Sequence, residues 1–279
     1  MRIRSRITFW CKDIEKARRI LEPFGLKPNT KPNVNIHAAE FFVDQKEYGE
    51  FLEALARYDI EPKPDELRTM FFDDNELAEA EYLHMAPAGY WGYPKPEDDY
   101  LNESYDVSNM CPHCGQGIRQ VKPLLVGKPG KFSKRDIAAL NWEFEWLVTD
   151  RLRNLIEKAG LTGAEFWPLL YSKKRIEIEN LSQLKVTNLT PPMSPNAEFE
   201  IRERRQMKCG HIPRTFGTHQ MKYLRKDLSL FKDFNLTNEH LGGGYFRLKR
   251  NTVVSSSVYK MFNQNKIRRV TFDPVIMED

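Results

Sequence analysis

The segment Cys111-Pro112-His113-Cys114-Gly115 constrains this chain more than any other part of its sequence. Two cysteines separated by two residues and followed by a glycine form a tight turn that aims both thiolates at one point. The glycine lets backbone N–H groups face the sulfurs. A zinc ion bound there needs two more ligands to complete a tetrahedron. The segment therefore predicts a zinc knuckle whose remaining ligands come from elsewhere in the chain.

A second Cys-Gly turn is the expected source of those ligands. Cys209 is the only later cysteine, and His211 follows it by two residues. Three cysteines and one histidine can form a closed structural zinc site. The predicted ligands are Cys111, Cys114, Cys209 and His211. The fourth position stays open, and the other candidates for it are His113, His219, Gln206 and a water molecule.

Other interpretations of the first cysteine pair are a reduced, metal-free pair and a redox-active pair. A redox pair normally opens a helix beside a strand, whereas Gly115-Gln116-Gly117 follows here and disfavours a helix. The four cysteines are spaced by 100, 3 and 95 residues, unlike a dense disulfide framework. Cys11, in a strand-like run, is expected to be a buried, inert thiol.

The bulk composition indicates a globular cytoplasmic protein. Its 279 residues, 41% hydrophobic and 12% aromatic, are enough for two compact units or one large α+β body. The sequence contains no apolar run long enough to span a membrane, and the basic start is not followed by a signal-type apolar region. We therefore expect no membrane association.

Charge is distributed unevenly along the chain. Residues 1–110 hold 14 Lys/Arg against 22 Asp/Glu, whereas residues 201–279 hold 16 against 7. Such asymmetry can steer a partner, or it can let two parts of the protein face each other.

The N-terminal region is predicted to be a β-α-β-α domain spanning 1–85. Asp13 and Asp74 are the expected helix N-caps. The predicted strands are 2–11, 34–43 and 67–72, and the predicted helices are 14–22, 46–57 and 75–81. Residues 86–110 follow as an aromatic loop without a period, which we expect to be ordered by packing of Tyr90, Trp91 and Tyr93 onto the body.

The C-terminal domain, 111–279, contains an internal repeat with a constant offset of 106 residues. Val148-Thr149 opens a helix, and a strand with Phe166-Trp167-Pro168-Leu169 follows. Val254-Ser255 and Phe272-Asp273-Pro274-Val275 repeat this pattern. Thr149 and Ser255 are the matching N-caps. Each copy is preceded by one Cys-Gly turn, so we predict a duplicated helix–strand unit, related by an approximate twofold or by a translation in one sheet, with the zinc knuckle between the copies. The predicted class is α+β, with mixed sheets and flanking helices.

These motifs resemble those of the double-CXXCG motif proteins noted in myxobacteria, and of immunity-protein families of bacterial polymorphic toxin systems. The resemblance covers roughly 105–279. Cys111-x-x-Cys114-Gly115 matches fully, whereas the second turn has Gln206 where the family has a cysteine. The resemblance implies a non-enzymatic bacterial protein that binds a cognate toxin.

No grouping of residues in the sequence supports a catalytic role. The run 242–244 lacks the Lys-Ser/Thr of a phosphate loop and is expected to be a turn before a strand at 245–249. His37, His84 and His240 are expected to be ordinary core or surface histidines. The leading hypothesis is therefore a zinc-stabilised, immunity-like protein that neutralises a toxin by direct binding. The alternative is a nucleic-acid-binding protein that uses the zinc turn and the basic C-terminal region.

Overall fold

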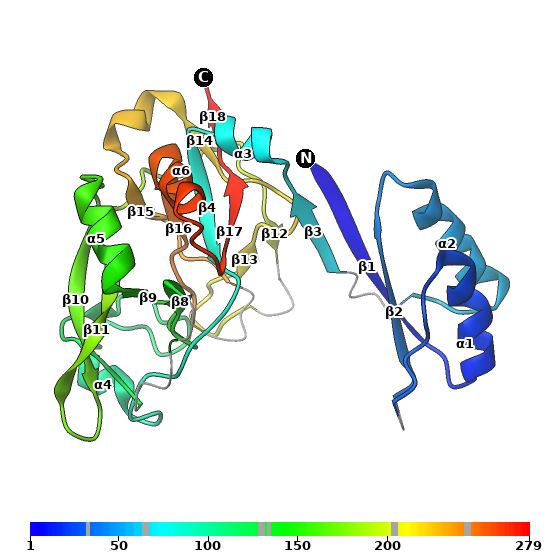
Figure 1. The fold of residues 1–279 in the computed structure, drawn as a ribbon, viewed down its shortest axis with the longest axis horizontal. Helices are drawn as coiled ribbons and strands as arrows, with labels where there is room; N and C mark the ends of the chain where they lie inside the picture. Colours follow the sequence, from blue (N-terminus) through cyan, green and yellow to red (C-terminus); the bar gives the residue numbers. More distant parts are fainter. Residues whose placement is uncertain (32–33, 63–66, 128–131, 133–134, 202–205, 243–246) are drawn as a thin grey trace. The chain divides into compact units, whose positions relative to one another are not determined.

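The computed structural model describes the whole chain except residues 32–33, 63–66, 128–131, 133–134, 202–205 and 243–246 (Figure 1). The described residues form two compact units, 1–73 and 74–279. The chain combines helices with mixed sheets, which confirms the α+β class. Residues 243–246 of the predicted turn and strand at 242–249 lie outside the described residues, and Lys249 forms only an isolated bridge with Leu241. No described helix has the length and apolar character needed to cross a bilayer.

The unit boundary corrects the predicted N-terminal domain of 1–85. Strand β4 (Tyr82–Pro87) pairs with β16 (Thr252–Ser255) and β17 (Val270–Pro274), both near the C-terminus. These pairings place β4 inside the second unit. Local sequence patterns cannot reveal these strand pairings, because the paired residues are more than 160 positions apart.

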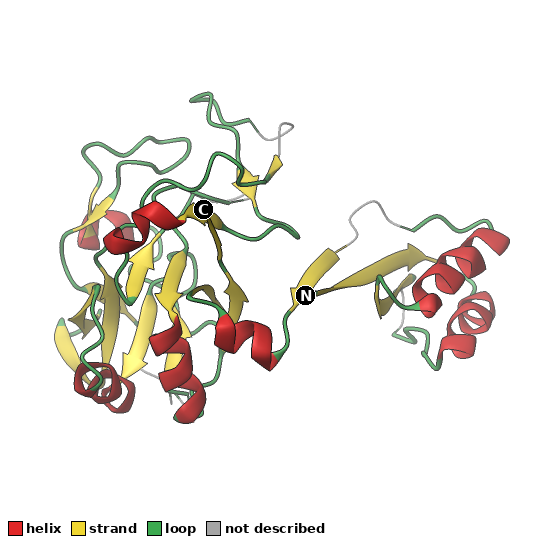
Figure 2. Cartoon of the chain, turned by 90° about the horizontal axis from the view of Figure 1, so that it is seen from above, coloured by secondary structure: helices red, strands yellow, loops and turns green. Residues whose placement is uncertain are grey.

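The first unit is an antiparallel sheet of order β2-β1-β3, with two helices against one face (Figure 2). Asp13 caps the first helix as predicted, because its carboxylate accepts hydrogen bonds from the N–H groups of Glu15 and Lys16. The elements follow the predicted order: β1 (Arg2–Trp10), α1 (Ile14–Leu21), η1 (Glu22–Phe24), β2 (Ile36–Phe42), α2 (Lys46–Arg57) and β3 (Leu67–Phe71).

The second unit is built on two main sheets. The first has the order β7 (Leu124–Val126), β10 (Ala164–Tyr171), β11 (Ile176–Val186), β9 (Trp146–Thr149), β8 (Ile137–Ala139). The second has the order β15 (Phe234–Leu236), β16, β4, β17. The longer helices are α5 (Asp150–Lys158) and α6 (Ser256–Gln264). The shorter elements are α3 (Asp74–Glu79), α4 (Tyr100–Ser104), β5 (Tyr105–Asp106), β6 (Arg119–Gln120), β12 (Glu200–Ile201), β13 (Arg214–Thr215), β14 (Lys222–Leu224), η3 (Arg225–Leu230) and β18 (Ile276–Glu278).

Two strand–helix–strand units, β9–α5–β10 and β16–α6–β17, occupy the segments of the predicted repeat. In each unit, a further strand lies between the two outer strands and is antiparallel to both. This strand is β11 between β9 and β10, and β4 between β16 and β17. The registers also correspond. Val148 and Pro168 both pair with Ser182. The residues 106 positions later, Val254 and Pro274, both pair with Leu83. The middle strands come from different places in the chain, so they fall outside the sequence repeat.

The two strand–helix–strand units contact each other through residues that are 106 positions apart in the sequence. Trp146 Nε1 donates a hydrogen bond of 2.8 Å to Oγ1 of Thr252, its counterpart 106 residues on. Glu143 and Lys249, which share that offset, form an ion pair. Corresponding residues meet near a twofold axis and stay apart under a translation. The units lie in different sheets, which excludes a translation within one sheet. Descent from one duplicated ancestor stays a prediction.

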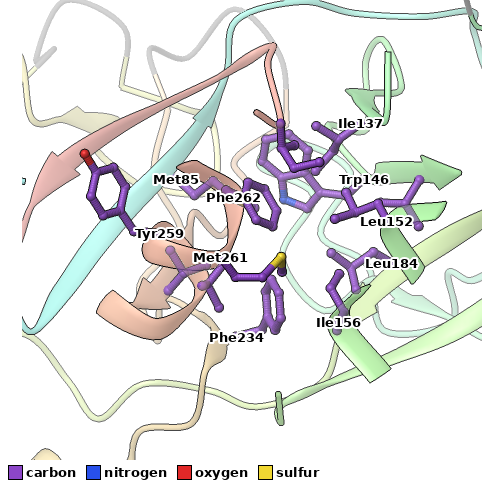
Figure 3. Packing of buried hydrophobic residues seen from close by; sticks show 14 of the residues in the cluster. Met85, Ile137, Trp146, Leu152, Ile156, Leu184, Phe234, Tyr259, Met261 and Phe262 are labelled. Atoms are coloured by element: carbon purple, nitrogen blue, oxygen red, sulfur yellow. The ribbon is translucent and has the colours of Figure 1, made fainter. Parts of the chain in front are cut away.

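Both helices bury their corresponding positions in a single hydrophobic core (Figure 3). Leu152 and Ile156 of α5 correspond to Val258 and Phe262 of α6, and each is at most 2% exposed. Figure 3 shows Phe262, Met261 and the α5 side chains converging between the two sheets. This core therefore joins the two strand–helix–strand units within the second compact unit.

The two helix starts differ in their capping. The Thr149 hydroxyl accepts a hydrogen bond from the Leu152 N–H, as predicted. Ser255 holds the corresponding position, but its hydroxyl donates to the Asp233 carboxylate at 2.7 Å and does not cap α6. Both residues hold the predicted N-cap positions, but only Thr149 caps its helix through its side chain.

Substitution of Phe262 by Ala tests the shared core. We expect Phe262→Ala to lower the free energy of unfolding by about 3–5 kcal/mol, because it removes a buried ring and leaves a cavity. Urea-induced unfolding measures the change. The control is Lys260→Ala on the exposed face of α6, for which we expect a change within about 0.5 kcal/mol. Equal effects of both substitutions would show that α6 does not pack in this core.

Candidate metal centre

The first cysteine turn is closed by its own backbone. The Cys111 N–H donates to the Gln116 carbonyl at 2.7 Å, and the Gly115 N–H donates back to the Cys111 carbonyl at 2.9 Å. Gly115 has φ 78°, in the left-handed region that other residues rarely adopt. The glycine therefore lets the chain fold back so that Cys111 and Cys114 lie on the same side of the turn.

Gly115 is also required by a close neighbour. A Cβ atom on it would lie 2.6 Å from Cγ of Arg247, which is closer than real atoms approach. The adjacent Leu248 N–H donates to the Cys114 carbonyl at 2.9 Å. The knuckle is thus held against the segment that leads into β16.

The second turn is tighter than the first. The Gly210 N–H donates to the Met207 carbonyl at 2.8 Å, and the Met207 N–H donates to the His211 carbonyl at 2.9 Å. Gly210 has φ 84° and serves the same purpose as Gly115. Gln206 lies outside this hydrogen-bonded turn and is exposed. Its position therefore gives no support to Gln206 as a ligand.

The structure brings three of the four predicted ligands together. The sulfur atoms of Cys111, Cys114 and Cys209 all lie within 4.8 Å of one another. In a tetrahedral zinc site with Zn–S bonds of ~2.3 Å, the sulfurs are separated by roughly 3.8 Å. The three thiols can therefore hold a metal ion after small shifts of their side chains.

The two knuckle thiols differ in their proton affinity. Hydrogen bonds from the backbone N–H groups of Cys114 and His113 lower the pKa of Cys111 to about 7. Burial raises the pKa of Cys114. Cys111 is thus the thiol most readily available as a thiolate, the form that binds metals.

The histidines near the cluster have different surroundings. His211 is not part of the close group of sulfurs, but its Nε2 atom is buried and has no hydrogen-bond partner among the described residues. Burial and the nearby Arg214 lower its pKa, which favours the neutral form that binds metals. His113 is exposed, and Nδ1 of His219 lies 2.9 Å from a carboxylate oxygen of Glu198. Of the three, only His211 combines burial with a free ring nitrogen.

A buried carboxylate next to the knuckle was missed by sequence reasoning. Glu143 is 6% exposed, and its side chain contacts the guanidinium of Arg247, the ammonium of Lys249 and the hydroxyl of Tyr100. Tyr100 donates at 2.5 Å. The sequence repeat could have indicated this contact, because Glu143 and Lys249 are separated by the same 106 residues as the two copies of the repeat.

A second polar network lies on the first sheet, and its residues line the same cavity as Glu143. The side-chain amides of Gln120 and Gln183 donate to each other at 2.8 Å. Gln183 also donates to Glu145 at 2.8 Å, and Lys185 donates to Gln120 at 2.7 Å. Burial raises the pKa of Glu145 and lowers that of Lys185. Burial thus disfavours the charged form of both groups.

Comparison with known proteins assigns no family to this chain. No family model matches it, and no curated protein shows significant sequence similarity. The resemblance to the double-CXXCG and immunity families stays a prediction that rests on the quoted motifs.

Removal of one sulfur tests the metal centre. We expect purified protein to hold about one zinc ion per chain and Cys209→Ser to lose it, because two sulfurs bind zinc poorly. Elemental analysis measures the ion, and a chelator should lower the melting temperature of the unsubstituted protein alone. Cys11→Ser is the control, since Cys11 lies in the other unit. Full metal content in Cys209→Ser would refute the site.

The carboxyl group of Glu145 predicts a pH dependence of stability. Burial, the largest cause, raises its folded-state pKa, and the nearby Lys185 opposes this. A carboxyl with a raised folded pKa stabilises most below its unfolded pKa, and this contribution is lost as the pH rises. Glu145→Gln has no proton to lose. Relative to the unsubstituted protein, its free energy of unfolding should therefore increase between about pH 4 and about pH 8. Urea unfolding at both values measures this, and a constant difference would contradict it.

Proposed function

We propose that this chain is a zinc-stabilised binding protein, without a catalytic role, that neutralises a cognate bacterial toxin protein by direct contact. Three converging sulfurs support a soft or borderline metal, and zinc is the ordinary choice for a closed cysteine site. The resemblance of residues 105–279 to immunity families supplies the expectation of a toxin partner. We place both the zinc-bound protein and its toxin complex in the bacterial cytoplasm.

His211 is the proposed fourth zinc ligand. Its unpartnered, buried Nε2 and its position two residues after Cys209 support this assignment. A closed set of three sulfurs and one nitrogen leaves no coordination position for a substrate, which fits a structural ion.

The observation that carries the proposal of a protein partner is a group of exposed aromatic side chains in the second unit. Tyr90, Tyr93 and Phe144 are 42%, 43% and 40% exposed. Tyr90 packs beside Phe144 with ring centroids 5.5 Å apart, and Tyr93 packs beside Trp142 at 4.9 Å. We call these four residues the aromatic surface. Aromatic residues of this kind dominate the binding energy of many protein interfaces.

The backbone beneath the aromatic surface is strained. Trp142 and Phe144 have φ of 70° and 58°, which is unfavourable for side chains of this size. Each such residue costs roughly 1–3 kcal/mol. The strained turn sends Glu143 into the interior and leaves Phe144 exposed. A fold that needed only the buried carboxylate has no use for bulky aromatics in this turn, which supports a role in binding.

The prediction that the aromatic loop packs onto the body is correct for Trp91. The centroid of its ring lies 5.5 Å from that of Phe132, and its backbone N–H donates to the Ala139 carbonyl at 2.9 Å. Tyr90 and Tyr93 contact neighbouring rings but keep much of their surface exposed. Trp91 thus fixes the loop, and the two tyrosines remain available to a partner.

Co-purification with the products of neighbouring genes tests the function. We expect one toxin protein to bind, and the double substitution Tyr90→Ala/Tyr93→Ala to weaken binding by about tenfold or more, since each hot-spot residue contributes over ~1 kcal/mol. Metal content should not change. The matched control is Ile176→Ala, which removes an exposed apolar side chain from β11.

Two outcomes would contradict the proposal. One is equal binding by the tyrosine double variant and Ile176→Ala. The other is tight, salt-sensitive binding to nucleic acid with no protein partner found, which would favour the basic C-terminal region as a nucleic-acid surface.

A further inference from the structure

A cavity of about 270 Å³ lies beside the buried carboxylate of Glu143, within the second unit. Apolar side chains, including Trp146, Leu184 and Leu236, form part of its wall. Charged side chains form the rest. The cations are Arg119, Lys185, Lys249 and Arg250, and the carboxylates are Glu143 and Glu145. Cationic side chains therefore outnumber carboxylates two to one.

Two of the cations are held by uncharged oxygens. Lys185 Nζ donates to the side-chain oxygen of Gln120 at 2.7 Å. Arg250 Nη1 donates to the backbone carbonyls of Thr237 and Asn238 at 2.6 and 2.5 Å. These hydrogen bonds position the cations without neutralising them. Lys249 differs, because it is paired with Glu143.

A hydroxyl group without a partner also belongs to the cavity wall. Tyr105 lines the cavity and is 7% exposed, and its Oη has no hydrogen-bond partner among the described residues. Burial raises the pKa of Tyr105 well above its ordinary value, so the hydroxyl keeps its proton and can donate. A buried hydroxyl left unpaired costs about 1–3 kcal/mol. A ligand that accepts its hydrogen bond removes that cost.

The fold itself does not require a lysine at this place. Lys185 pairs with Glu165 in the first sheet, and the corresponding pair in the second sheet is Ala86 with Thr271. Ala86 lines a second cavity, whose wall shares Trp146 and Thr252 with the first. The same sheet geometry is thus built with alanine at one position and a desolvated lysine at the other. Burial disfavours the lysine, so its presence indicates a use for its charge.

We propose that this cavity binds a small organic anion, a carboxylate or a phosphate monoester. Its charged group would lie between Lys185 and Arg250 and accept a hydrogen bond from Tyr105, and its apolar part would pack on Trp146 and Leu184. The volume suits a ligand of roughly ten heavy atoms, near the lower end of ligand pockets. Phe144 belongs to both the aromatic surface and the cavity wall. The anion proposal does not use Phe144 and is tested without a protein partner, so the two proposals can fail separately.

Glu145 is the carboxyl group nearest in influence to Lys185, and each group acts on the pKa of the other. Burial is the main cause that raises its pKa, which favours its uncharged form. Its Oε2 atom already accepts a hydrogen bond from Gln183. The second carboxylate, Glu143, is compensated by Arg247 and Lys249. Arg119 is paired with Asp106 and Lys249 with Glu143, whereas Lys185 and Arg250 form no ion pair with a carboxylate among the described residues.

Ligand-observed NMR and calorimetric titration of the full-length protein test this inference. The anionic probes are benzoate and phenyl phosphate, and the matched controls are neutral benzamide and cationic benzylamine, all at equal ionic strength. We expect at least one anion to bind at millimolar or lower concentration and neither control to bind. The two anionic probes distinguish a carboxylate from a phosphate ligand.

Two substitutions locate the bound anion. Lys185→Met keeps the stem and removes the charge, and should weaken binding by about tenfold or more. Tyr105→Phe removes only the hydroxyl and should weaken it by about three- to tenfold. Lys158→Met on the exposed end of α5 is the control and should bind as the unsubstituted protein does. Circular dichroism confirms that each variant is folded.

Several results would overturn the inference. Failure of both anions to bind the unsubstituted protein would do so, as would equal binding of benzamide. Unchanged anion affinity in both Lys185→Met and Tyr105→Phe would place the anion elsewhere on the protein and would also overturn it.

Discussion

The buried carboxylate of Glu143 connects three parts of the second unit: the segment that contacts the cysteine knuckle, the turn of Trp142 and Phe144, and the wall of the cavity. Arg247 and Lys249 compensate its charge, so the segment before β16 is fixed against the turn that holds Glu143. Breaking such a buried ion cluster costs about 3–5 kcal/mol, because an uncompensated charge remains. The same segment carries Leu248, whose N–H holds the Cys114 carbonyl. Metal centre, aromatic surface and cavity therefore share one anchor.

Local chemistry made much of this structure predictable from its sequence. The Asp13 cap, the helix at 46–57 and the offset of the two strand–helix–strand units follow from short-range patterns that the structure reproduces. The convergence of Cys111, Cys114 and Cys209 was also predictable, because few other roles suit paired Cys-Gly turns. The fourth ligand was not, since the sequence offers several side chains of similar chemistry near Cys209.

Long-range pairing explains what the sequence could not reveal. The predicted N-terminal domain includes residues 82–85 and the predicted loop includes 86–87, yet these residues together form β4, the middle strand between β16 and β17. The role of Lys185 was also hidden, because a charged residue in a strand ordinarily points to solvent. Its enclosure depends on the approach of the two main sheets, and no local pattern encodes that approach. The cavity thus lies where the two main sheets of the second unit meet.

Amide hydrogen exchange of the Glu143→Gln variant tests the anchoring role of this carboxylate most directly. The account predicts that the Leu248 amide, which donates to Cys114, exchanges at least about tenfold faster in the variant, since its anchor is weakened. Amides of α1 and α2 in the first unit should keep their exchange rates. Unchanged protection at Leu248 in the folded variant would contradict the claim that Glu143 holds the metal centre and the cavity in place.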